Sequence, residues 1–133
     1  MVAAHQQITR EWWESRIRFH LYVSQIVIQE VGGGNPDAAK MRLKALEGIP
    51  ILKLSQDARV LAQELIIRGP MPEKAALDAL HIGIAVVNGM DYLLTWNCTH
   101  IANAAMRSMI DSVCRSEGYT PPVICTPEEL MEG

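Results

Sequence analysis

The chain has 133 residues and is 49% apolar, so it is long enough to bury the core of one ordinary domain. Its formal net charge of -3 does not favour non-specific binding to nucleic acid, although a local basic groove is compatible with that total. The three cysteines lie far apart and form no CxxC pair, which argues against a disulfide framework or a zinc knuckle. We therefore expect a single domain over residues 1–133.

The sequence contains no signal for a membrane or for secretion. No apolar run approaches the roughly 18 residues of a membrane-spanning helix. The first residues, MVAAHQQITREWW, are too polar for a secretory signal. Because scattered, unpaired cysteines fit a reducing compartment, we expect a cytoplasmic protein that does not enter a membrane.

Helices and short strands alternate along the first part of the chain. Helix formers and apolar residues at helical spacing predict a first helix over about residues 4–18. A short strand is predicted at 21–24, and Ser24 can cap the next helix, QIVIQEV, which three glycines end. Asn35, followed by a proline at the first helical position, is a strong start signal for a further helix.

The same alternation continues to the end of the chain. A buried strand at 49–54 precedes a helix that Ser55 opens, and Pro72 starts the helix EKAALDALHIGIAVVNG, which is apolar on nearly every side. Strands follow at 91–95 and 123–125, with a long amphipathic helix between them. Since the strands lack an alternation of polar and apolar residues, we predict a parallel α/β sheet with helices on both faces.

Three polar residues need an explanation in such a sheet, where reactive groups gather beyond the carboxyl ends of the strands. Asn97 lies just past the strand at 91–95, and Asp78 lies about two turns into the preceding helix. Glu30 lies near a helix C-terminus, where the helix dipole opposes a carboxylate by roughly 0.3–1 kcal/mol and a divalent cation would favour it. The alternative is two solvated carboxylates and a turn asparagine.

Further polar and aromatic residues have two interpretations each. His81, one helical turn after Asp78, either orients a carboxylate or phosphate or is a buried core histidine. His100 lies near a helix N-terminus, which attracts phosphate, and Trp96 either stacks on a base or packs in the core. Two tryptophans and three arginines near the start of the chain either form an aromatic and basic surface for nucleic acid or contribute to packing and to a solvated helix face. They are Trp12, Trp13, Arg10, Arg16 and Arg18.

The segments YVSQIVIQEV, EKAALDALHIGIAVVNGMDYLLTWNCTHIANA and PPVICTPEELM together resemble the PIN-domain family, close to the VapC-type toxins of bacterial toxin-antitoxin pairs. The resemblance covers nearly the whole chain, and DALHIGIA followed by YLLTWN is its most specific part. It implies a three-layer PIN-like α/β fold with a parallel sheet. By this resemblance Glu30, Asp78 and Asn97 match the second, third and fourth polar positions of a metal site, and Thr95 matches the small hydroxyl residue at the strand end.

The resemblance implies an endoribonuclease that depends on Mg²⁺ or Mn²⁺ and is controlled by a cognate antitoxin protein. Glu30 and Asp78 are then direct or water-mediated metal ligands, and Asn97 is a neutral outer ligand or orients a water molecule. His81, His100 and Thr95 are candidates for contact with the RNA substrate. In such sites the cation lowers the pKa of a bound water molecule and offsets charge on the phosphoryl oxygens.

The chain departs from the family at its start. PIN domains begin with a central strand that carries the first metal-site acid, whereas no acidic residue on a strand precedes Glu11, and Glu11 and Glu14 lie on a helical pattern. We therefore expect an N-terminally shortened domain that lacks the central first strand, binds Mg²⁺ weakly and has little or no activity. Unpaired strand edges favour pairing with another chain, so we expect a homo-oligomer such as a dimer.

Two other functions stay open at this point. One is a non-catalytic PIN-like module that binds a protein or RNA through Trp12, Trp13 and an open sheet edge. The other is a metal-dependent DNA nuclease.

Overall fold

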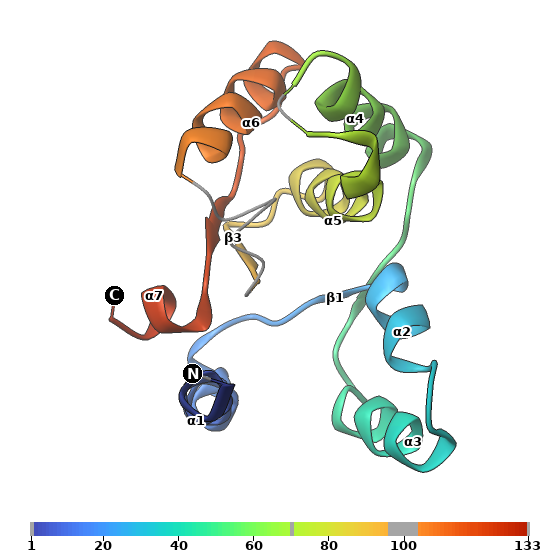
Figure 1. Cartoon of the computed structure of the whole chain (residues 1–133), viewed down its shortest axis with the longest axis vertical. Helices are drawn as coiled ribbons and strands as arrows, with labels where there is room; N and C mark the ends of the chain where they lie inside the picture. The colour runs from blue at the N-terminus through green and yellow to red at the C-terminus, as the bar shows by residue number, and fades with distance from the viewer. Residues whose placement is uncertain (1, 70, 96–103, 133) are drawn as a thin grey trace.

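The computed structural model describes residues 2–69, 71–95 and 104–132, which form a mixed α/β structure of helices and short parallel strands (Figure 1). The first part of the chain contains α1 (Val2–Glu14), η1 (Arg16–Arg18), β1 (Val23–Ser24), α2 (Gln25–Val31), α3 (Pro36–Ala45) and β2 (Ile51–Leu52). The second part contains α4 (Gln56–Ile67), η2 (Glu73–Ala75), α5 (Ala76–Val87), β3 (Tyr92–Leu94), α6 (Ala104–Ser116), β4 (Val123–Cys125) and α7 (Pro127–Glu132).

The described strands form two separate parallel pairs. β1 pairs with β2, with Val23 opposite Ile51, and β3 pairs with β4, with Tyr92 opposite Val123. The mixed α/β class and the parallel pairing confirm the coarse prediction from sequence, in which a parallel sheet lacks its central strand. Over the residues that the structure describes, no strand joins β1 to β3.

Polar caps start the helices where the sequence predicts them. Ser24, Asn35 and Ser55 each accept a hydrogen bond from the backbone N–H three residues later, at 3.1, 3.0 and 3.2 Å. At α7 the Thr126 hydroxyl accepts from the Glu129 N–H, and the Glu129 carboxylate accepts from the Thr126 N–H. This reciprocal arrangement is a capping box, so these local signals are confirmed.

Two helix boundaries differ from the prediction. The helix predicted to start at Pro72 begins with the separate 3₁₀ turn η2, in which the Ala75 N–H donates to the Pro72 carbonyl at 2.9 Å. Asp78 therefore lies in the first turn of α5 instead of two turns inside a helix. The helix predicted over 4–18 is likewise divided into α1 and η1. Where α1 ends, the Ser15 hydroxyl donates to the carbonyls of Glu11 and Trp12.

The main core lies between α4, α5, α6 and β4, which gather at one end of the molecule in Figure 1. Its largest fully buried side chains are Leu61, Leu65, Ile82, Ile110 and Cys114. Helices α4 and α5 approach closely because α5 has a glycine at their contact. A Cβ atom on Gly83 would stand 2.5 Å from the Ala58 carbonyl oxygen, so the observed spacing requires glycine.

Helix α5 is the apolar core helix that the sequence predicts, with six of its residues buried: Ala79, Ile82, Gly83, Ile84, Ala85 and Val86. It has 12 residues, about 18 Å at the usual helical rise. None of the helices in the described ranges combines the length and the apolar composition that crossing a bilayer requires.

Candidate functional site

Glu30 and His81 come together from two helices that are far apart in the sequence. The Oε1 atom of Glu30, in the last turn of α2, lies 2.9 Å from Nε2 of His81 in α5. The His81 side chain is 17% exposed, whereas that of Glu30 is 47% exposed. The imidazole is therefore largely covered, and the carboxylate still faces solvent, where it can accept a further ligand.

A small apolar cluster explains why these two residues meet. Ile26 of α2, Ala58 of α4 and Ile84 of α5 are buried against one another. Glu30 follows Ile26 by four residues, and His81 precedes Ile84 by three, so each polar residue shares a helix face with its buried neighbour. Packing of Ile26 against Ile84 thus brings Glu30 next to His81.

Arg42 of α3 holds the end of the helix that carries Glu30. Its Nε atom donates to the Val31 carbonyl at 3.3 Å, and its Nη2 atom donates to the Gly33 carbonyl at 3.1 Å. A cation at a helix C-terminus offsets the negative end of the helix dipole. Arg42 therefore supplies positive charge at the helix end that carries Glu30, where a bound cation would otherwise be the source of such charge.

Asp78 lies one helical turn before His81, on the same face of α5. Its side chain is half-buried, and it belongs to the first turn of the helix, where the dipole favours a carboxylate. Glu30 of α2 thus contacts His81, which lies one helical turn after Asp78 on α5.

The other predicted site residues follow β3. Thr95 directly follows this strand: it is half-buried, and its N–H donates to the Cys125 carbonyl at 2.9 Å. Asn97, His100 and Trp96 lie outside the described residues. The described part of the candidate site therefore consists of Glu30 on α2, Asp78 and His81 on α5, and Thr95 after β3.

The donor chemistry of this region suits a hard cation. Glu30 and Asp78 offer carboxylate oxygens, and Mg²⁺ commonly binds through one or two carboxylates while it keeps several water molecules. His81 would fix the orientation of Glu30, as a hydrogen-bonded neighbour does for metal-binding carboxylates. No cluster of three or more His, Cys, Asp or Glu side chains that could hold a metal ion occurs among the residues that the structure describes.

Most of the aromatic and basic residues that the sequence offered as a nucleic-acid surface make contacts within the protein. Trp12 is only 9% exposed and packs in the interior, so stacking of this ring on a base is wrong and the packing interpretation is confirmed. The Arg16 guanidinium lies 4.2 Å from the ring centre of Trp13, and that of Arg18 lies 5.4 Å from the ring centre of Phe19. These cation–π contacts stabilise the segment around η1.

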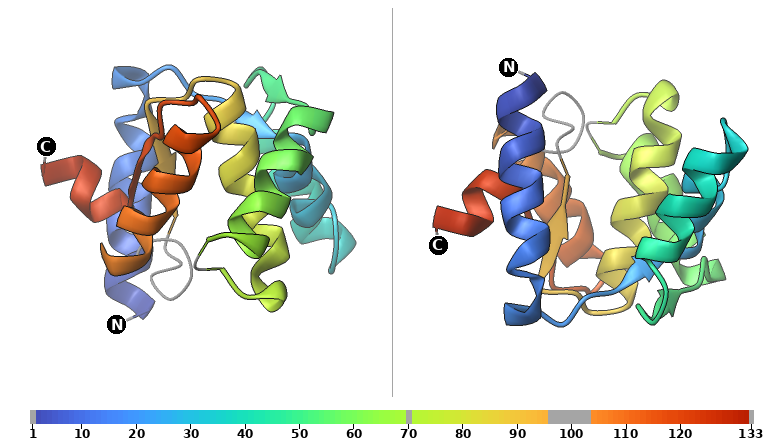
Figure 2. Two further views of the ribbon diagram at one scale, coloured as in Figure 1. Left: turned by 90° about the horizontal axis from the view of Figure 1, so that it is seen from above. Right: turned by 90° about the horizontal axis from the view of Figure 1, so that it is seen from below.

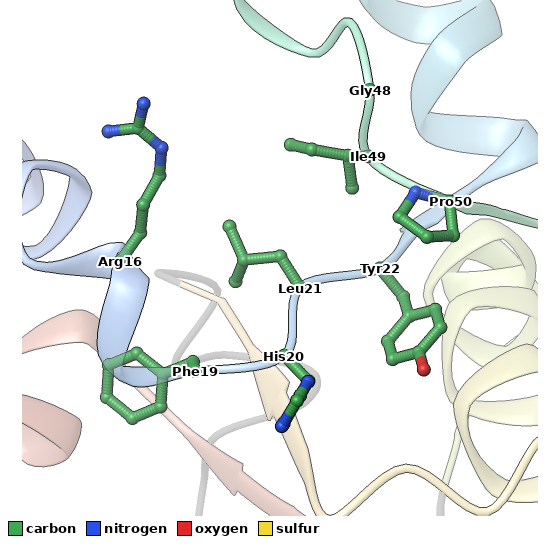
Figure 3. Close-up of a pocket in the computed structure, with 8 residues that line it drawn as sticks. All are labelled: Arg16, Phe19, His20, Leu21, Tyr22, Gly48, Ile49 and Pro50. Carbon is green, nitrogen blue, oxygen red and sulfur yellow. The ribbon is translucent and has the colours of Figure 1, made fainter.

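A small open pocket of about 360 Å³ lies beside this segment (Figure 3). In Figure 3, Leu21 and Ile49 lie on one side of the chain that leads into β1, and His20 and Tyr22 lie on the opposite side. Such alternation is typical of an extended chain. The pocket is lined by Arg16, Phe19, His20, Leu21, Tyr22, Gly48, Ile49 and Pro50.

A larger groove of about 740 Å³ runs between the two strand pairs, and residues of β1, β3, α1 and α5 line it. His81 is one of the lining residues, so the Glu30–His81 pair stands at its border. The sequence predicted open strand edges but not that two of them would share one groove. The contact of Glu30 with His81 was also not predicted, although the spacing of both residues from buried isoleucines is visible in the sequence.

Comparison of the chain with protein-family models, with curated proteins and with solved structures finds no match.

Proposed function

We propose that the chain is a divalent-metal-dependent endoribonuclease with a PIN-like fold, similar to VapC-type toxins, that acts on RNA and is controlled by a protein antitoxin. The observation that carries the proposal is the meeting of two distant segments. Glu30 of α2 lies 2.9 Å from His81, and Asp78 lies one helical turn before His81 on α5, so the proposal places both carboxylates on one cation beside His81. The parallel strand pairs also agree with this fold class.

In the proposed mechanism, Glu30 and Asp78 would hold the cation, and Asn97 would act as a neutral outer ligand, as the family resemblance implies. Bound Mg²⁺ or Mn²⁺ supplies charge that activates a water molecule and stabilises the phosphoryl oxygens. His81 would keep the Glu30 carboxylate oriented through Nε2, and the Glu30 side chain as a whole is 47% exposed. The low number of charged ligands predicts weak metal binding and slow cleavage.

Single-turnover cleavage assays with enzyme in excess of RNA test the proposal, because they detect slow reactions. We expect cleavage with Mg²⁺ or Mn²⁺ that stops in a chelator. Asp78→Asn and Glu30→Gln should each reduce the rate by more than roughly tenfold. Asp37→Asn is the matched control, since Asp37 also lies in the first turn of a helix but is exposed on α3, and it should cleave normally.

Equal cleavage by Asp78→Asn and by the unchanged protein would contradict the proposed site, and so would cleavage in the chelator. A parallel assay with single-stranded DNA distinguishes a ribonuclease from a DNA nuclease. Absence of cleavage with every metal, combined with RNA binding that is equal with and without metal, would favour the second candidate.

The second candidate function is a non-catalytic module that binds a protein or RNA. The observation in its favour is the groove between β1 and β3, because an accessible groove beside two strand edges is a binding surface that needs no chemistry.

A further inference from the structure

The last turn of α2, which carries Glu30, contributes little to the core. The helix has seven residues, of which Ile26 is the buried one. A helix this short is marginal without tertiary contacts. Three glycines follow it at 32–34, and glycine restricts the backbone less than any other residue does. The position of the Glu30 carboxylate therefore depends on what holds this end of the helix.

Arg42 holds this end from the neighbouring helix. Helices α2 and α3 lie side by side at one edge of the molecule (Figure 2). Arg42 follows Ala39, the buried residue of α3, by three residues, so both start from the same face of the helix. Its two hydrogen bonds, at 3.3 and 3.1 Å, reach the carbonyls of Val31 and Gly33. The planar guanidinium therefore fixes the last residue of α2 and the glycine segment at once.

The backbone of Glu30 belongs to the segment that Arg42 binds. The Gly32 N–H donates to the Ile28 carbonyl at 3.1 Å, and the Gly33 N–H donates to the Glu30 carbonyl at 3.2 Å. Gly33 thus accepts from Arg42 through its own carbonyl while its N–H is bonded to Glu30. At the other end of the residue, the Glu30 carboxylate lies 2.9 Å from Nε2 of His81. Glu30 is therefore held at its backbone as well as at its carboxylate.

Arg42 acts on a cation at Glu30 in two opposite ways. Its positive charge repels a divalent cation and weakens binding, but solvent and salt screen the charge of an exposed side chain. Its hydrogen bonds hold the carboxylate in one place, and residues that orient a ligand in this way strengthen metal binding. Because the repulsion is screened and the hydrogen bonds are direct, we expect the second effect to be larger.

We propose that Arg42 is a positioning residue for the candidate metal site. By holding the end of α2 it keeps Glu30 against His81, and it thereby raises the affinity for a divalent cation despite its own positive charge. Arg42 is not itself a ligand, since a guanidinium has no acceptor. The inference deepens the proposed function and rests on it, because it concerns the cation that Glu30 and Asp78 would share.

Mn²⁺ binding by three variants separates geometry from charge. Arg42→Lys keeps the charge but loses the planar pair of donors, and Arg42→Gln loses the charge as well. Both should bind Mn²⁺ roughly threefold to tenfold more weakly than the unchanged protein, as measured from the EPR signal of free Mn²⁺. Lys40→Gln is the matched control, since Lys40 is exposed on the opposite face of α3. Its affinity should stay within about twofold of the unchanged protein.

A second measurement needs no metal. A nuclear Overhauser effect between the ring protons of His81 and the side-chain protons of Glu30 reports their contact. It should be present in the unchanged protein and in Lys40→Gln, and it should be weaker or lost in both Arg42 variants. A variant that is destabilised but keeps Glu30 in place would retain this signal in its folded molecules, so the measurement separates positioning from a general loss of stability.

Three results would overturn the proposal. The first is Mn²⁺ binding that is unchanged in Arg42→Lys and tighter in Arg42→Gln, because charge alone would then act. The second is an unchanged signal between His81 and Glu30 in both variants, and the third is equal weakening of Mn²⁺ binding by Lys40→Gln. If the unchanged protein binds no Mn²⁺, the proposed function fails, and the metal-free signal alone decides whether Arg42 positions Glu30. If Arg42→Gln does not fold, as judged by circular dichroism, Arg42→Lys decides the question.

Discussion

Replacement of Gly83 with alanine should loosen the contact between α4 and α5. The new Cβ would stand 2.5 Å from the Ala58 carbonyl oxygen, whereas ordinary contact begins at 3.4 Å. The obstacle is backbone, so a side-chain rotation cannot relieve it, and the two helices must separate locally by about 0.9 Å. Overpacking of this kind costs about 1–3 kcal/mol.

The intrinsic helix preference of alanine acts in the opposite direction. Alanine in a helix interior is more favourable than glycine by up to about 1 kcal/mol. With the full helix gain of about 1 kcal/mol, the difference leaves a predicted loss of up to about 2 kcal/mol in the free energy of unfolding. Because Ala58 also packs with Ile26 and Ile84, the same shift should weaken the contact of Glu30 with His81.

Urea unfolding followed by far-UV circular dichroism measures this loss. Gln63→Ala is the matched control, since it places the same residue on the exposed face of α4 and should change stability by less than about 0.5 kcal/mol. If Gly83→Ala is as stable as the unchanged protein or more stable, then the described approach of α5 to α4 is wrong.

Three further outcomes are expected. A double-mutant cycle with Glu30→Gln and His81→Gln, measured by urea unfolding, should give a coupling of about 0.2–1 kcal/mol, because the Glu30 carboxylate is half exposed. Thr126→Ala should cost about 0.5–2 kcal/mol in the same assay, since the hydroxyl caps α7. Burial, with a smaller effect of Asp111, raises the pKa of the Cys114 thiol from 9.0 to about 11. The native state therefore holds this proton more tightly than the unfolded state, and the free energy of unfolding should fall by about 2 kcal/mol between pH 9 and 11.

Each of these outcomes has a result that opposes it. Zero coupling between Glu30 and His81 would mean that their contact does not form in solution. A Thr126→Ala protein of unchanged stability would remove the capping role of the hydroxyl. For the thiol, Cys114→Ala is the control: if it loses as much stability from pH 9 to 11 as the unchanged protein, other groups are responsible.

Local features of this fold could be predicted from the sequence because they depend on a few neighbouring residues. Asn35 and Ser55 cap α3 and α4 where the pattern places them, since the acceptor and the N–H it binds are three residues apart. The predicted place of Asp78 within its helix was wrong. A 3₁₀ turn and an α-helix have similar residue compositions, so the sequence after Pro72 does not show where one changes into the other.

Long-range features could be predicted only in part. The parallel pairing of the strands follows from the alternation of elements, but which strand pairs with which depends on contacts between residues far apart in the chain, and no local pattern encodes these contacts. The contact of Glu30 with His81 depends on which faces of α2 and α5 meet. The sequence shows that Glu30 shares a face with Ile26, yet it does not show that Ile26 packs against Ile84.

A titration with Mn²⁺, followed by NMR, tests directly whether α2 and α5 share a divalent cation. The paramagnetic ion broadens the signals of nearby backbone amides. Broadening should centre on Glu30, Asp78 and His81, should spare Asp37 on α3, and should disappear in the combined variant Glu30→Gln, Asp78→Asn. Broadening that centres elsewhere, or that persists in this variant, would show that Glu30 and Asp78 do not form a metal site.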